Sequence, residues 1–242
     1  MKKLQIVANP KYVKELVTDY EKLSERCEEF DLTKKNKDAQ EIILSLKNTL
    51  RTYPEMVGLS AGQIGYTKRI LCLNFNGDIR TFVNPIITNV KGFELSRETC
   101  HSEPDRTFIR PRHNKVDVTY QTPLGKVESV ELVGLAARVM QHHIDHLDGV
   151  LLSDIGLEVD SEFDKATDEE KQEVINFYLD SLDIAKSEIE TAIQNDPEAK
   201  QISDAVRFTE SVRKGETVLE PLTDEELKEL MDKQAENQEN ND

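Results

Sequence analysis

Four of the five histidines in the sequence lie next to a cysteine or next to one another: His101 follows Cys100, and His142, His143 and His146 fall within five consecutive positions. Side chains four positions apart share one face of a helix, with Cβ atoms about 5 to 6 Å apart. His142 and His146 can therefore reach one ion. Two imidazoles and a thiolate suit a divalent metal such as zinc or ferrous iron, with a further position open to water. This pattern predicts a metal site made by Cys100, His142 and His146.

The histidine pair taken alone allows a second interpretation. Pairs with this spacing also occur on solvated helix faces that bind nothing, and short motifs often match by chance. In a true site the ion lowers the pKa of a bound water and so provides hydroxide near neutral pH. The choice between a polar patch and a metal centre therefore depends on the segments that surround these residues.

Helical and strand patterns occupy the chain between and around the histidines. From 37 to 53 apolar residues recur every three or four positions, as in a helix with one buried face, and the glycine-rich loop VGLSAGQIGY follows. The β-rich runs RILCLNF and IRTFVNPII flank Asn76-Gly77-Asp78, which is a strong hairpin signal. The runs KVDVTY and KVESVEL predict a second hairpin, with Val116, Val118 and Tyr120 on one face. Together these segments predict an antiparallel sheet.

Two further helices are indicated downstream of the hairpins. The first, from Glu131 to Leu147, carries the histidines, and Gly149 is a suitable stop. Thr167 and Glu170 have the spacing of a capping box that begins a helix extending to about residue 193. The same signal recurs from Thr223 to Glu226, and the polar last residues, QAENQENND, predict disorder.

Charge divides the chain into two parts. Residues 1–156 carry 22 Lys and Arg against 21 Asp and Glu, whereas residues 157–242 carry 9 against 26. We therefore expect a metal-binding domain over 1–156 and an acidic helical extension over 157–242. Such an extension repels nucleic acid and anionic lipid, so we expect it to contact neither. Its helices are expected to cover their own domain, or else to meet a protein partner.

Composition indicates a cytoplasmic protein. Hydrophobic residues make up 37% of the chain, and they form neither a membrane span nor the apolar run of a secretory signal. The three cysteines, Cys27, Cys72 and Cys100, are an odd number at unrelated spacings. A disulfide framework is therefore not expected, and Cys27 and Cys72 are expected to be buried free thiols.

Three ordered motifs resemble the signatures of the peptide deformylase family. They are GLSAGQIG at 58–65, ETCHS at 98–102 and QHHIDHLDG at 141–149, and the segments LQIVANP, FVNPII and RPRHNKVDVTY are also similar to that family. The resemblance covers residues 1 to about 155. It implies an α+β fold with antiparallel sheets around the metal-binding helix. It also implies an activity, the removal of the N-terminal formyl group from N-formylmethionyl peptides and nascent chains in protein biosynthesis.

The resemblance also implies roles for individual residues. Cys100, His142 and His146 would hold one Fe²⁺ or Zn²⁺, while Ni²⁺ and Co²⁺ suit the same ligand types. Gln63 would donate its side-chain amide to the developing oxyanion, joined by the backbone N–H of His101. The residues that would flank the substrate are Val57, Gly58 and Leu59.

The sequence departs from the family pattern beside the metal ligands. The family motif is HExxH, whose glutamate moves a proton from water to the leaving amine, and His143 occupies that position. Thr99 and His101 replace the usual glycine and leucine around Cys100. His143 could serve as the base, bind metal or stack. Glu98 is expected to pair with Arg112, and Asp145 either orients a ligand imidazole or lies on the helix surface.

Three functions follow as hypotheses. The favoured one is an active, metal-dependent hydrolase of N-formylmethionyl peptides in which His143 acts in place of glutamate. The alternative is a catalytically weak or inactive homologue that binds metal and peptides or a protein partner. A third is a metal-dependent hydrolase of another amide, permitted by the changed residues His101 and His143.

Overall fold

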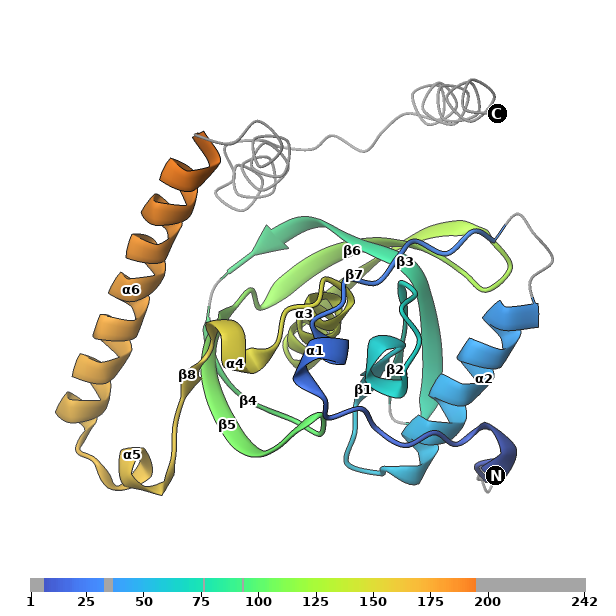
Figure 1. Cartoon of the computed structure of the whole chain (residues 1–242), viewed down its shortest axis with the longest axis horizontal. Coiled ribbons are helices and arrows are strands. Elements are labelled where there is room, and N and C mark those ends of the chain that lie inside the picture. Colours follow the sequence, from blue (N-terminus) through green and yellow to red (C-terminus); the bar gives the residue numbers. More distant parts are fainter. Residues whose placement is uncertain (1–6, 33–36, 76, 93, 195–242) are drawn as a thin grey trace. The chain divides into compact units, whose positions relative to one another are not determined.

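The strands of the protein pair into two antiparallel sheets. The computed structural model describes residues 7–32, 37–75, 77–92 and 94–194, with side chains as far as residue 182 in the last helix. One sheet has the strand order β1-β2-β3-β6-β7 and the other the order β4-β5-β8 (Figure 1). The strands are β1 (Gly58–Ser60), β2 (Ile70–Phe75), β3 (Asp78–Lys91), β4 (Glu94–Cys100), β5 (Glu103–Arg112), β6 (Lys115–Gln121), β7 (Val127–Val133) and β8 (Leu157–Glu158).

Helices join and cover these strands, which confirms the expected α+β fold. The expected N-terminal helix is α2, and the histidine-bearing helix is α3, which lies among the strands in Figure 1. The helices are α1 (Tyr20–Leu23), α2 (Lys37–Thr52), α3 (Leu135–Leu147), α4 (Leu152–Ile155), α5 (Ser161–Lys165) and α6 (Asp168–Gln194), with short 3₁₀ turns η1 (Pro10–Tyr12) and η2 (Gly62–Ile64).

Both predicted hairpins form. β2 and β3 meet around Gly77, whose φ of +92° glycine adopts without steric cost, while Asn76 of the predicted turn lies outside the described residues. β6 and β7 pair without a register shift from Lys115 opposite Val133 onward. The two valines expected on the inner face of β6 are fully buried. The period-two pattern therefore identified the face of the sheet that packs on the core.

The helix α3 begins four residues later than predicted. We expected it to begin at Glu131, but Glu131 and Val133 still pair with β6, and Gly134 then turns the chain with a φ of +59°. The apolar residues at the end of β7 continue the three- and four-residue spacing of the helix, so the sequence pattern placed the start of the helix too early. The core that α3 shares with the large sheet contains Ala137, Met140, Ile144 and Leu147 on the helix and Leu71, Phe82, Val116 and Val118 on the strands.

The first part of the acidic extension contacts the smaller sheet. β8 pairs with β5, and the predicted capping box begins α6, because Thr167 N–H donates to Glu170 Oε2 at 2.8 Å and Glu170 N–H donates to Thr167 Oγ1 at 3.3 Å. On α6, Tyr178 is buried, and its hydroxyl donates to the carbonyl of Ile155 at 2.6 Å. This helix therefore packs on the chain that precedes it.

The described residues as far as Ala192 belong to one compact unit. A domain boundary at residue 156, which the charge distribution suggested, stays a prediction. The second capping box and the polar end of the chain lie outside the described residues. Among the helices of the described ranges, none combines the length and the apolar content that crossing a membrane requires.

Candidate metal centre

Cys100 ends β4, and His142 and His146 lie one turn apart on α3. Sγ of Cys100 and Nε2 of His146 are 3.2 Å apart, and one donor atom from each of the three residues lies within 4.8 Å of the others. Cys100 and His146 are buried, and only a small part of His142 is exposed. A thiolate and two imidazoles are ligands that zinc and iron accept. The three side chains therefore fit a single divalent ion.

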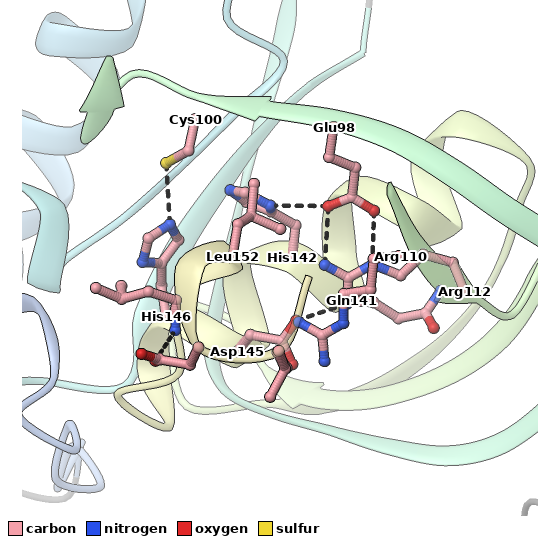
Figure 2. Close-up of polar contacts among 12 residues, drawn as sticks. Glu98, Cys100, Arg110, Arg112, Gln141, His142, Asp145, His146 and Leu152 are labelled. Atoms are coloured by element: carbon pink, nitrogen blue, oxygen red, sulfur yellow. Dashed lines mark hydrogen bonds and ion pairs between the residues drawn. The ribbon is translucent and has the colours of Figure 1, made fainter. Parts of the chain in front are cut away.

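His142 is oriented by Glu98. Nδ1 of His142 lies 3.1 Å from Oε2 of Glu98, which leaves Nε2 as the nitrogen free for an ion (Figure 2). Arg112 donates to the same carboxylate from Nε at 2.7 Å and from Nη2 at 2.8 Å. Burial raises the pKa of Glu98, but the hydrogen bonds from Arg112 and His142 outweigh it and hold that pKa well below its ordinary value. The expected Glu98–Arg112 pair is confirmed, and Glu98 is ionised.

Asp145 contacts arginines and no ligand imidazole. Its Oδ2 accepts from Nη1 of Arg110 at 2.7 Å and from Nη1 of Arg112 at 2.5 Å (Figure 2). Among the described residues, Nδ1 of His146 has no hydrogen-bond partner. Asp145 therefore acts on the site only through Arg112, which connects it to Glu98.

Gln63, on η2, is held with its amide nitrogen toward the cysteine. Its Oε1 accepts from the backbone N–H of Ser60 at 3.0 Å and from the Ser60 hydroxyl at 3.1 Å. Its Nε2 lies 3.5 Å from Sγ of Cys100 and 3.3 Å from Oγ of Ser102. Because Ser60 occupies the carbonyl oxygen, Gln63 is a buried, fixed hydrogen-bond donor beside the three candidate ligands.

His143 stacks inside the same group of imidazoles. Its ring lies 6.1 Å from that of His146 with an interplanar angle of 29°, and its nitrogens are not among the three donor atoms that cluster. A Cβ added at Gly58 would lie 2.3 Å from Nε2 of His143, so only glycine leaves room for this ring. Burial, together with the charges of His142 and His146, lowers the pKa of His143 well below its ordinary value. The ring is therefore neutral near pH 7.

A cavity of about 240 Å³ opens onto these side chains. Of the residues expected to flank a substrate, Val57 and Gly58 line it, whereas the Leu59 side chain is fully buried in the core and is not among the lining residues. His101 also lines the cavity, and its Nε2 contacts Oε1 of Glu55 at 3.1 Å. The structure thus brings every candidate residue except the Leu59 side chain to the cavity or to the ligand group.

Three features of the site were missed from the sequence. The contact of Glu98 with His142 has no signal in spacing, because the two lie on different elements. Arg138 and Arg97 also line the cavity. Arg138 was detectable, because it precedes His142 by the same four positions that separate His142 from His146.

Comparison with known proteins connects the fold and the site to one group of enzymes. The sequence model of a family described as polypeptide deformylase matches residues 7–159. A peptide deformylase of Thermodesulfovibrio yellowstonii is 37% identical over 124 residues, which are 49% of this chain and 74% of the relative. One of Dictyoglomus turgidum is 32% identical over 130 residues, 51% of this chain and 85% of the relative. The crystal structure of peptide deformylase from Thermotoga maritima matches with a TM-score of 0.55 and 29% identity, over 59% of this chain and 96% of that chain.

Proposed function

Since the chain belongs to the peptide deformylase family, we propose that it hydrolyses the formyl group from the N-terminal methionine of formylated peptides and nascent chains. One observation carries the proposal: a ligand group of Cys100, His142 and His146 lies beside the amide of Gln63 at one cavity. Metal ligands and a fixed hydrogen-bond donor are two of the parts that metal-assisted amide hydrolysis uses.

The reaction is the hydrolysis of one amide. The bond between the formyl carbon and the peptide nitrogen breaks, the oxygen of water adds to that carbon, and the products are formate and a free amine. Water must lose a proton, and the leaving nitrogen must gain one. When bound, a divalent ion supplies Lewis acidity that activates water and polarises the formyl carbonyl.

Gln63 and His101 are the proposed donors to the formyl oxygen as it gains negative charge. Nε2 of Gln63 is held in place by the hydrogen bonds that Ser60 gives to its Oε1. The backbone N–H of His101 would be the second donor, since it follows Cys100 directly. Removing one such donor typically costs about 3 to 4 kcal/mol of transition-state stabilisation.

His143 is the proposed carrier of the proton. A neutral imidazole can accept a proton at an unprotonated nitrogen, and Nδ1 of His143 has no partner among the described residues. The lowered pKa of His143 makes it a weak base, however. We therefore expect slower turnover than glutamate at this position would give.

The proposed cofactor is one Fe²⁺ or Zn²⁺ held by Cys100, His142 and His146, and Ni²⁺ or Co²⁺ would also suit these ligands. The proposed location is the cytoplasm, where formylated chains are made. Metal analysis of anaerobically purified protein identifies the ion. One equivalent per wild-type chain, lost in Cys100→Ala, is the expected result.

The deciding experiment is cleavage of formyl-Met-Ala-Ser by anaerobically purified protein loaded with iron or zinc. Turnover that disappears in Cys100→Ala supports the proposal. His143→Glu is expected to raise the rate and His143→Gln to abolish it, because glutamine cannot accept the proton. A rate that falls in His143→Glu would show that this site requires the imidazole and that a carboxylate cannot take its place.

The low pKa of His143 also supports a second candidate function, a metal-binding homologue with little or no catalysis. In that case formyl-Met-Ala-Ser remains intact while the wild-type chain still binds one ion. Tight binding of Met-Ala-Ser without turnover would then identify a peptide-binding protein.

A further inference from the structure

Arg138 places a cation in the wall of the cavity next to a candidate metal ligand. It lies on α3 four positions before His142, so the two side chains project from one helix face with Cβ atoms about 5 to 6 Å apart. Both residues line the cavity, and Leu135 and Val139 of the same helix line it as well. Apart from its histidines, the part of the cavity wall that α3 forms is therefore apolar except for the guanidinium of Arg138, which lies near a candidate metal ligand.

This guanidinium has hydrogen-bond donors to spare. Its Nε forms an ion pair with Oε1 of Glu94 at 3.4 Å, with both side chains partly exposed, but makes no hydrogen bond to a described residue. An arginine side chain can donate five hydrogen bonds.

The other charged side chains that line the cavity already have closer partners. Arg97 donates to both oxygens of Asp164, at 2.5 and 2.9 Å. Glu98 is held by two nitrogens of Arg112, and Glu55 contacts His101. Among the described residues that line the cavity, Arg138 is therefore the cation with the most capacity to bind an added anion.

We propose that Arg138 determines specificity by recognising a carboxylate on the side chain of the formylated residue. The cavity would then accept N-formyl peptides that begin with glutamate alongside those that begin with methionine. Leu135 and Val139 would pack on the methylene groups of either side chain, and the guanidinium would bind the carboxylate of glutamate. This inference rests on the proposed hydrolysis at the same site.

The test compares Glu and Met as the first residue in two assays. One is kcat/KM of the metal-loaded full chain for formyl-Glu-Ala-Ser and formyl-Met-Ala-Ser. The other is calorimetric binding of the products Glu-Ala-Ser and Met-Ala-Ser, which requires no turnover. Arg138→Met keeps the length of the side chain and removes its charge. It is expected to weaken the Glu peptides about tenfold or more and the Met peptides by less than about threefold.

Two further variants separate contact from general charge. Arg138→Lys keeps the charge and loses the planar fork, so an intermediate loss is expected. Arg97→Met also removes a guanidinium from the cavity wall, but this guanidinium is already paired with Asp164. The ratio of kcat/KM for the Glu peptide to that for the Met peptide is therefore expected to stay within about threefold of wild type. An equal loss in Arg97→Met and Arg138→Met, or an unchanged ratio in Arg138→Met, would overturn the inference.

The two assays also separate this inference from the proposed function. If neither formyl peptide is cleaved while Arg138→Met still loses Glu-Ala-Ser binding, the specificity inference holds and the proposed function fails. If both are cleaved with a ratio that Arg138→Met leaves unchanged, the proposed function holds and the specificity inference fails.

Discussion

Nδ1 of His142 and Oε2 of Glu98 lie 3.1 Å apart, so a carboxylate on β4 orients a candidate metal ligand on α3. The same carboxylate is clamped by Arg112, which is 3% exposed. A partner of this kind fixes the ring orientation and the tautomer of a ligand histidine. Metal affinity should therefore depend on a residue that never touches the ion.

Glu98→Gln is expected to weaken metal binding about 10- to 100-fold, because the amide holds His142 and Arg112 less firmly. Competition against a chelator, with zinc as the metal, measures the affinity. Glu55→Gln is the matched control, since Glu55 lines the same cavity but contacts His101 and none of the three candidate ligands. Equal zinc affinities in wild type and Glu98→Gln would contradict the role assigned to Glu98.

Gly58→Ala is expected to displace His143 and to destabilise the fold by about 1 to 3 kcal/mol, as overpacking does. The added Cβ would lie 2.3 Å from Nε2 of His143 and 2.9 Å from Cδ2 of Leu73. Chemical denaturation measures the change. Gly62→Ala is the control, because its Cβ would meet its nearest neighbour, Sγ of Cys27, at an ordinary 3.5 Å.

A second variant tests the cause of that loss. Adding His143→Ala to Gly58→Ala removes the ring that the new methyl group meets. The double variant should then unfold at a higher denaturant concentration than the sum of the two single changes predicts. Simple additivity would show that the ring does not need the space at Gly58.

Cys72 gives the chain an alkaline pH dependence. Burial raises the pKa of its thiol to about 11, whereas an unfolded thiol ionises near pH 8.5. Between these values the folded chain keeps a proton that the unfolded chain loses. The contribution to stability is therefore complete below about pH 8.5 and disappears as the pH rises through about 11.

Removal of the thiol should abolish this pH-dependent contribution to stability. In Cys72→Ala the unfolding free energy is lower by a constant packing loss, and it lacks the thiol's decline with pH. The gap between wild type and variant should change by about 2 to 3 kcal/mol from pH 8 to pH 11. Denaturation curves across this range measure it, and a constant gap would contradict a raised pKa.

Tyr178 tests whether α6 stabilises the domain through its contact with the end of α4. Tyr178→Phe removes the hydrogen bond to the Ile155 carbonyl and is expected to cost about 0.5 to 1.5 kcal/mol. Phe177→Ala, at a neighbouring side chain that is 78% exposed, should stay within about 0.5 kcal/mol. Thermal unfolding measures both. Truncation after residue 160 should lower the melting temperature further, and an unchanged temperature would make the extension a separate element.

Local patterns predicted the elements well wherever one residue decides the backbone. Gly77 allowed the hairpin turn, and Thr167 with Glu170 began α6. The helix from 131 was wrong at its start, because apolar residues of a strand and a helix look alike over a few positions. The pairing of β7 with β6 and the turn at Gly134 distinguish them in the structure.

The two histidine ligands were predictable because residues four positions apart on a helix share one face, whereas Cys100 lies on a strand and was predicted from its residue type. The contacts that hold the candidate ligands in place were predictable only in part. The pair of Glu98 and Arg112 joins neighbouring strands, whereas the contact of Glu98 with His142 joins a strand to a helix. The Leu59 side chain does not line the cavity, because strand alternation along β1 directs it into the core.

The ligands of the candidate centre come from a strand and a helix, with Cys100 and His146 separated by 46 positions. An ion held between them closes a long loop of chain, and cross-links of that length restrict the unfolded state strongly. The metal would then hold β4 and α3 together in addition to its part in catalysis. A chain deprived of its metal would be easier to unfold and to degrade, so the supply of metal would set how long the protein lasts.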